Sequence, residues 1–229
     1  MTKNFKLLDI IKESERDMFE GFVESELTED YPVGFDLSEF KKIWSYAGKL
    51  RYAREHLGKP IGSGSARTVY RVDETKVLKL AKNKKGVAQN DAETDWTNDA
   101  YYGEIIAKVH DFDEHDHLWV EMELAFKAKK SDFKTMWGVD FMNLGFYITN
   151  FYNLNHSKRP MFGIDDDVKD VLDESHEVQL LCSFVLDSSA PPGDIRRISS
   201  WGKVKREDGE YLVLIDFGLN KSVYTSYYS

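Results

Sequence analysis

The chain has 229 residues, a hydrophobic fraction of 41% and five Trp, which suits one large or two-lobed domain and argues against wholesale disorder. Its 31 Lys and Arg against 40 Asp and Glu give a formal charge of -9, which disfavours a general nucleic-acid-binding surface. We expect a cytoplasmic protein that does not enter the membrane. No apolar run approaches roughly 20 residues, no signal-peptide core is found, and Cys182 is the single cysteine.

Two helices are expected at the start of the chain. The first covers residues 5–22, where apolar side chains recur at helical spacing. The second begins after Asp36, which is placed to cap it in a capping box with Glu39. Apolar residues then recur at helical spacing as far as Leu57, and Gly58 ends the helix.

The rest of the chain gives strand signals first and helix signals later. A turn is expected over 111–116, between two strands. The predicted strands are 66–73, 76–81, 118–122 and 211–216. The predicted helices are 86–95 and 171–186, the second ended by Pro191 and Pro192. This order predicts an α+β fold with two lobes.

A glycine-rich segment, Gly62-Ser63-Gly64, precedes the first of these strands. Glycines let the backbone turn tightly and bring its N–H groups against phosphate oxygens. The segment leads into a strand, whereas the glycine-rich loop of a dinucleotide-binding fold leads into a helix. It is therefore a candidate phosphate-binding turn, although a short Gly-Ser-Gly also occurs in ordinary turns.

Lys79 lies inside the apolar strand 76–81. A lysine in that setting must reach solvent or find an anionic partner, and a phosphate together with a carboxylate would satisfy it. Glu93, on the following helical segment, is the candidate carboxylate, although a surface glutamate is an equally good interpretation of that residue alone.

Two later strands end on residues that suit a nucleotide site. Residues 119–125 form a strand that runs into a connector. Residues 211–216 form an apolar strand that ends in Asp216, followed by Phe217 and Gly218. A carboxylate at the end of a strand is well placed to hold Mg²⁺ against phosphates.

In this order, these motifs resemble the protein-kinase superfamily over about residues 57–220. The resemblance implies a two-lobed kinase-like fold that binds ATP and Mg²⁺. The residues it implies for nucleotide binding are Gly62, Ser63, Gly64, Val69, Lys79, Glu93, Met122, Glu123 and Ala125.

The resemblance also implies a role for each part of this set. Lys79 would contact the α- and β-phosphates and be oriented by Glu93. Met122 would line the back of the adenine pocket, and the backbones of Glu123 and Ala125 would bind the adenine edge.

The catalytic loop is expected between the connector and Asp216, and the best candidate is the segment 192–199. Its Gly193-Asp194 resembles the loop of small-molecule kinases, so Asp194 would orient or accept the proton of the attacking hydroxyl. Asp216 would hold the metal, and Ser199 stands where the family has an asparagine that binds a second metal.

Several features depart from an ordinary kinase. Arg67 replaces the third glycine and would add bulk and charge over the phosphates. Pro192 stands where the family has histidine, and Ser199 is a poorer metal ligand than asparagine. Few residues follow Gly218 in the sequence, so we expect neither a full activation segment nor the later substrate-docking helices. This reduced plan resembles the small kinase-like proteins of tailed bacteriophages.

Three functions stay open at this point. The first is a degenerate kinase that acts as a binding or regulatory module, with a host protein as partner if the chain is phage-encoded. The second is an active atypical kinase that uses Lys79, Asp194 and Asp216 on a protein or small molecule. The third is a structural or virion-associated protein that reuses the fold. The predicted parts are a helical extension (1–57), an N-lobe (58–125) and a reduced C-lobe (126–229).

Four other features are interpreted as structural. The basic cluster Lys82, Lys84 and Lys85 is expected to be solvated loop charge. The Asp and His residues of 113–117 are expected to form a turn rather than a metal site. The aromatic residues between 137 and 152 are expected in the core rather than stacked on bases, and Cys182 is expected to be buried.

Overall fold

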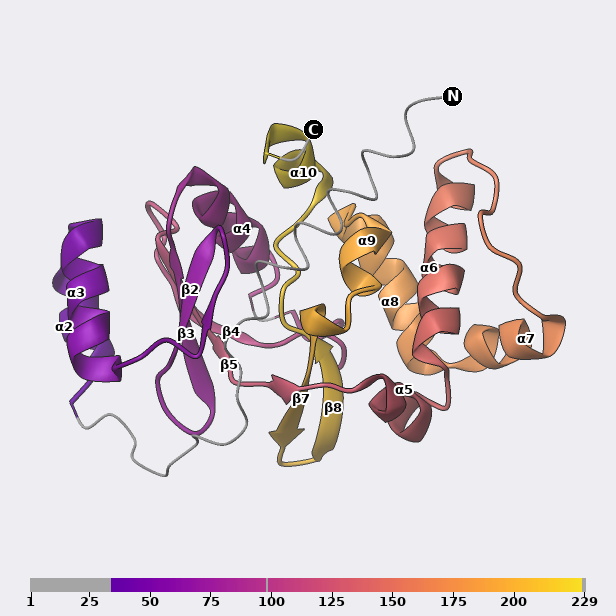
Figure 1. Cartoon of the computed structure of the whole chain (residues 1–229), viewed down its shortest axis with the longest axis horizontal. Helices are drawn as coiled ribbons and strands as arrows, with labels where there is room; N and C mark the ends of the chain where they lie inside the picture. Colours follow the sequence, from indigo (N-terminus) through magenta and orange to yellow (C-terminus); the bar gives the residue numbers. More distant parts are fainter. Residues whose placement is uncertain (1–33, 98, 228–229) are drawn as a thin grey trace. The chain divides into compact units, whose positions relative to one another are not determined.

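The α+β class is confirmed in this computed structural model, which describes residues 34–97 and 99–227 (Figure 1). The helix expected over 5–22 lies outside the described residues. The chain divides into two compact units. The first ends at Asn90 and resumes over Asp111–Met122, and the second comprises Asp91–His110 and Glu123–Ser229. No helix in the described part of the chain has both the length and the apolar character needed to cross a bilayer.

The first unit is built on a five-stranded sheet with the order β1-β2-β3-β5-β4. The strands are β1 (Gly62–Ser63), β2 (Arg67–Arg71), β3 (Lys76–Ala81), β4 (Val109–Phe112) and β5 (Trp119–Glu123). The prediction for β3 is confirmed, and those for β2 and β5 hold with shifted ends. β4 was not predicted, and the turn expected over 111–116 is wrong at its start, because Asp111 and Phe112 belong to that strand.

The register of β2 and β3 sorts their side chains onto two faces. Val69 pairs with Lys79, and Tyr70 pairs with Leu78. Because partners in an antiparallel pair point the same way, Val69 and Lys79 share one face and Tyr70 and Leu78 the other. The second face packs into a buried cluster of Phe40, Ala53, Leu57, Tyr70, Leu78, Leu80 and Trp119. The helices before the sheet therefore cover this face and leave the Lys79 face to other partners.

The single helix expected between Asp36 and Leu57 is wrong, because two helices occupy it: α2 (Leu37–Lys42) and α3 (Tyr46–Leu57). The Asp36 side chain caps α2 as predicted, accepting from the N–H groups of its first turn. The expected return bond from Glu39 is replaced, since the Asp36 N–H donates to the Tyr52 hydroxyl at 3.3 Å. The break follows from Ser45, whose hydroxyl caps α3 and leaves Ile43 extended.

Helix α4 (Lys84–Thr94) follows β3, two residues earlier than predicted. Asn83 precedes its first residue, and the Asn83 side-chain oxygen accepts from the Gly86 N–H at 3.1 Å. A Cβ at Gly86 would lie 2.2 Å from the Ala66 carbonyl oxygen, so only glycine lets the helix start this close to the sheet.

The second unit combines a three-stranded sheet, of order β6-β7-β8, with most of the helices. Its elements are β6 (Phe126–Lys127), α5 (Lys130–Trp137), α6 (Phe141–Asn155), α7 (Asp166–Glu174), α8 (His176–Ser188), α9 (Pro192–Ile195), the 3-10 helix η1 (Ile198–Ser200), β7 (Trp201–Arg206), β8 (Gly209–Leu214) and α10 (Lys221–Tyr227). Strands β6 and β7 were not predicted, and β8 begins and ends earlier than expected.

The helix expected over 171–186 is also two helices. It breaks at Ser175, which has extended backbone and whose hydroxyl accepts from the Val178 N–H, so α8 has its own cap. The prolines that were expected only to end this helix also start the next one, because Pro192 is the first residue of α9.

Aromatic side chains form much of the core of the second unit. Trp201 is fully buried, with Phe133 at 5.0 Å and Trp137 at 5.4 Å between ring centroids, both edge to face. The core interpretation of the aromatic residues between 137 and 152 is confirmed for Trp137 and Phe141, while those further along α6 are half-buried.

Candidate functional site

The glycine-rich segment forms a hairpin between β1 and β2 in the first unit. Gly62 pairs with Val69 and Ser63 with Thr68. Inside the turn, the Gly64 N–H donates to the Arg67 carbonyl at 2.9 Å. That N–H is therefore engaged by the hairpin itself, and the Ser63 side chain lies at the exposed tip.

Lys79 is buried in the middle of β3, with only 6% of its surface exposed. Its direct neighbour across the ladder is Val69 of β2, so the Lys79 and Val69 side chains lie on the same face of the sheet. Leu78 and Leu80, on either side, point into the apolar cluster on the opposite face. A buried ammonium needs anionic or carbonyl partners, which is the setting that a phosphate-binding lysine requires.

Arg67 does not lie over the hairpin turn, and the prediction that it adds charge there is wrong. Its side chain is 8% exposed. The guanidinium instead reaches α4, where it lies 3.4 Å from Oδ1 of Asn90. Asn90 is fully buried and donates in turn to the His117 carbonyl at 2.8 Å. Arg67 thus links β2 to the following helix.

Glu93 is fully buried on α4, which excludes the surface-glutamate interpretation. A carboxylate without solvent must be met by cations or hydrogen-bond donors. Glu93 lies one turn after Asn90 on the same helix, α4. The helix that Arg67 contacts through Asn90 therefore also carries the Glu93 carboxylate. Its predicted pairing with Lys79 stays a prediction.

The three predicted connector residues, Met122, Glu123 and Ala125, make different contacts in the structure. Met122 is 1% exposed, and the Glu123 N–H donates to the Lys108 carbonyl at 2.8 Å. The Glu123 carboxylate binds Arg206 of β7, so this ion pair lies within the second unit. Ala125 packs against β7, where a Cβ at Gly202 would lie 2.5 Å from the alanine methyl. The predicted adenine contacts of these residues remain untested.

The candidate catalytic loop and Asp216 lie at the same end of the β7–β8 hairpin. Trp201 pairs with Leu214, and the Ile215 N–H donates to the Ser200 carbonyl at 2.8 Å. The residues before β7 and those after β8 therefore leave the hairpin side by side. The Trp201 indole N–H donates to the Ile195 carbonyl at 2.8 Å, which fixes the loop on the core.

Within that loop, Asp194 is a residue of α9, and its carboxylate lies 2.9 Å from a guanidinium nitrogen of Arg197. Both side chains are largely buried, with 17% and 22% exposed. Sequence reasoning did not single out Arg197, although its spacing from Asp194, one helical turn on, was the available signal. The arrangement gives the loop an acid with an adjacent cation.

The predicted metal ligands are Asp216 and Ser199, both half-buried. Among the described residues, no group of three or more His, Cys, Asp or Glu side chains is arranged to hold a metal ion. A carboxylate and a hydroxyl are both oxygen ligands of the kind that Mg²⁺ takes, and the metal-binding role of these two residues stays a prediction.

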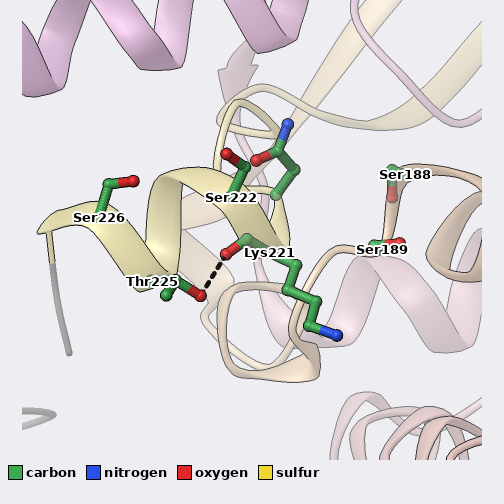
Figure 2. A pocket seen from close by; sticks show the side chains of 7 residues that line it. Ser188, Ser189, Lys221, Ser222, Thr225 and Ser226 are labelled. Carbon is green, nitrogen blue, oxygen red and sulfur yellow. Dashed lines mark hydrogen bonds between the residues drawn. The ribbon is translucent and has the colours of Figure 1, made fainter.

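A hydroxyl-rich hollow of about 550 Å³ lies in the second unit, between the end of α8 and α10. Figure 2 shows its labelled side chains and the bond from the Thr225 hydroxyl to the Lys221 carbonyl, 2.8 Å long. The lining residues are Ser188, Ser189, Asn220, Lys221, Ser222, Thr225 and Ser226. Hydroxyls, an amide and one ammonium suit a polar or anionic molecule. No sequence motif pointed to this hollow.

Two other predictions are confirmed. Asp113 organises a turn, since its carboxylate accepts from the N–H groups of His115, Asp116 and Leu118. Cys182 is buried, and burial raises the pKa of its thiol to about 12, so it is not a nucleophile at neutral pH.

No protein-family model matches the chain, and no curated protein matches it either.

Proposed function

We propose that this chain is a kinase-like nucleotide-binding protein that acts as a binding or regulatory module. One observation carries the proposal: Lys79 is buried on the strand that follows the glycine-rich hairpin, on the same face as the hairpin strand. In protein kinases a glycine-rich loop covers the phosphates, the phosphate-binding lysine is on strand β3, and its glutamate partner is on the next helix. The buried Glu93 of α4 supports the same plan.

The second unit supports the proposal in a different way. Asp194 is followed by the paired strands β7 and β8 and then by Asp216-Phe217-Gly218. A kinase catalytic segment has its loop aspartate and its Asp-Phe-Gly in the same order. Ser199 in place of the metal-binding asparagine weakens the case for efficient phosphate transfer. A module of this kind works through a protein partner, and the resemblance to phage proteins makes a host protein the partner that we propose.

An active atypical kinase is the second candidate, and the position of Asp194 and Asp216 at one end of the β7–β8 hairpin favours it. In this function the two carboxylates would orient the acceptor hydroxyl and hold Mg²⁺. The hydroxyl-rich hollow is the acceptor surface that we propose for it.

A thermal-shift titration with ATP, with and without Mg²⁺, tests nucleotide binding. ATP at about 100 times its Kd stabilises a protein by about 2.7 kcal/mol, which is easily measured. The shift should be lost in Lys79→Met and its Mg²⁺-dependent part in Asp216→Asn. Asp208→Asn is the matched control, because Asp208 lies at the other end of the same hairpin. A melting temperature that ATP leaves unchanged overturns the proposal.

Turnover separates the two candidates. Phosphate release or labelling that Asp194→Ala abolishes identifies the active kinase. Binding of ATP without turnover, together with a partner complex that survives in the Lys79→Met, Asp216→Asn double variant, identifies the module.

A further inference from the structure

Lys82 fastens the tip of the glycine-rich hairpin to the end of β3. Its ammonium donates to the Ser63 hydroxyl and to the Gly64 carbonyl, both at 2.6 Å. Its backbone N–H donates to the Ala66 carbonyl at 2.7 Å. Side chain and backbone of one lysine thus bind three residues of the turn. Lys82 is exposed in a loop, as the sequence predicted, but its contacts with the hairpin were not predicted.

The next residues of the chain extend this attachment. The Asn83 amide donates to the Ser65 carbonyl at 2.9 Å, and the Lys85 ammonium lies 3.4 Å from the Ser65 hydroxyl. Gly86 packs against the Ala66 carbonyl with no room for a methyl group. Every residue from Ser63 to Ala66 is therefore in contact with the junction between β3 and α4.

A turn with two glycines loses much conformational entropy when a ligand orders it. A turn that is already held in place avoids most of that loss when phosphate binds. We propose that Lys82 is a positioning residue that holds the glycine-rich hairpin in its phosphate-binding shape. The effect on phosphate rests on the proposed nucleotide binding, whereas the attachment rests on contacts within the first unit alone.

Lys84 provides a matched control. It belongs to the same basic cluster, but its exposed ammonium makes no hydrogen bond or ion pair with any other described side chain or backbone group. Replacing either lysine by methionine removes the same charge from almost the same place. Only Lys82→Met removes the two bonds to the hairpin, so the pair of variants separates attachment from general electrostatic attraction.

Amide hydrogen exchange of the free, full-length chain tests the attachment without any ligand. The reporters are the N–H groups of Ile61 and Gly64, which donate to Val69 and Arg67 within the hairpin. In Lys82→Met their exchange should be about fivefold faster, the equivalent of about one net hydrogen bond, and in Lys84→Met unchanged. Equal exchange in the wild type and Lys82→Met, or equal acceleration in both variants, overturns the proposal.

Titration with ATP and Mg²⁺ tests the positioning role. Lys82→Met should weaken binding about fivefold, and adding Ser63→Ala to it should cost little more, because both changes remove the same bond. Equal weakening by Lys82→Met and Lys84→Met would assign the effect to charge and overturn the role. If the wild type binds no ATP, the proposed function fails, and the exchange measurement still decides the attachment.

Discussion

Arg206 on β7 binds the carboxylate of Glu123 through two parallel hydrogen bonds, from Nε to Oε1 at 2.9 Å and from Nη2 to Oε2 at 2.6 Å. The Lys108 N–H donates to the same carboxylate at 3.1 Å. Arg206 also lies over the Tyr211 ring, 4.9 Å from its centroid. Planar two-point pairing of this kind is the strongest form of ion pair, and both of its partners lie within the second unit.

Glu123→Ala should lower the free energy of unfolding by about 3–5 kcal/mol, because the largely buried guanidinium of Arg206 loses its carboxylate partner and is left with the Gly103 and Ile106 carbonyls. Chemical denaturation followed by Trp fluorescence measures this loss. Glu207→Ala, an exposed change next to Arg206 in sequence, should stay within about 0.5 kcal/mol of the wild type. Similar losses in the two variants would show that the pair contributes nothing specific.

Acid should weaken the same ion pair. Burial raises the pKa of Glu123, but the hydrogen bonds from Arg206 and Lys108 outweigh burial and hold it below the ordinary value of 4.5. A lowered folded-state pKa gives stability that is complete above 4.5 and is lost as the pH falls through the folded-state value. The wild type should therefore lose more stability than Glu123→Gln between pH 5 and about pH 3. Parallel pH profiles would contradict this assignment.

Lys49 is the buried lysine of the helical part of the first unit. Its ammonium donates to the Phe40 carbonyl at 3.1 Å and lies 4.7 Å above the Phe40 ring. Burial lowers its pKa, with Asp113 acting in the opposite direction. Because the folded protein holds this proton less tightly than the unfolded chain, the contribution of Lys49 to stability should rise with pH towards the ordinary value of 10.5.

Lys49→Met should cost about 1–3 kcal/mol at pH 7, since the Phe40 carbonyl loses its donor. Measured as the pH is raised from 7 towards the ordinary value of 10.5, the difference from the wild type should grow. The matched control is Lys59→Met, an exposed change just beyond α3. It should change neither the free energy of unfolding at pH 7 nor its dependence on pH. A constant difference across this range would show that Lys49 keeps an ordinary pKa.

Much of the first unit could be predicted because local signals and final partners agree. The strand that carries Lys79 has the predicted ends, since its alternation matches one apolar face. Helix breaks were missed because the apolar spacing continues through them, and only the serines at 45 and 175 mark the new caps. Strand β6 is defined by β7, which lies far along the chain, so no local window could show it. Strands β4 and β7 pair with the next strand along the chain and were missed although their partners are local.

The candidate site shows the same division. The residue types and order of Gly62, Lys79, Asp194 and Asp216 are visible in the sequence. The direction of a long side chain is not, because it depends on what the fold brings near. Arg67 turns to Asn90 rather than to the hairpin, and the exposed Lys82 binds the hairpin, which the sequence did not indicate. In both cases the partner is far along the chain or on another element.

Gly86 allows a further test of how closely α4 packs on the sheet. A Cβ there would lie 2.2 Å from the Ala66 carbonyl oxygen and 3.0 Å from the Ala81 Cα, and both obstacles are backbone. Gly86→Ala would ordinarily stabilise a helix by about 1 kcal/mol. Here we expect a net loss of about 1–3 kcal/mol, because the helix must move away from the hairpin.

The control is Gly163→Ala, since a Cβ at Gly163 meets no atom within 4 Å. That change should leave the free energy of unfolding within about 0.5 kcal/mol of the wild type. The displacement of α4 in Gly86→Ala should also speed hydrogen exchange in the hairpin, because the bonds from Asn83 and Lys82 start from the same junction. A stabilised Gly86→Ala variant would mean that the helix starts further from Ala66 than described, and the attachment of the hairpin by Lys82 would lose its support.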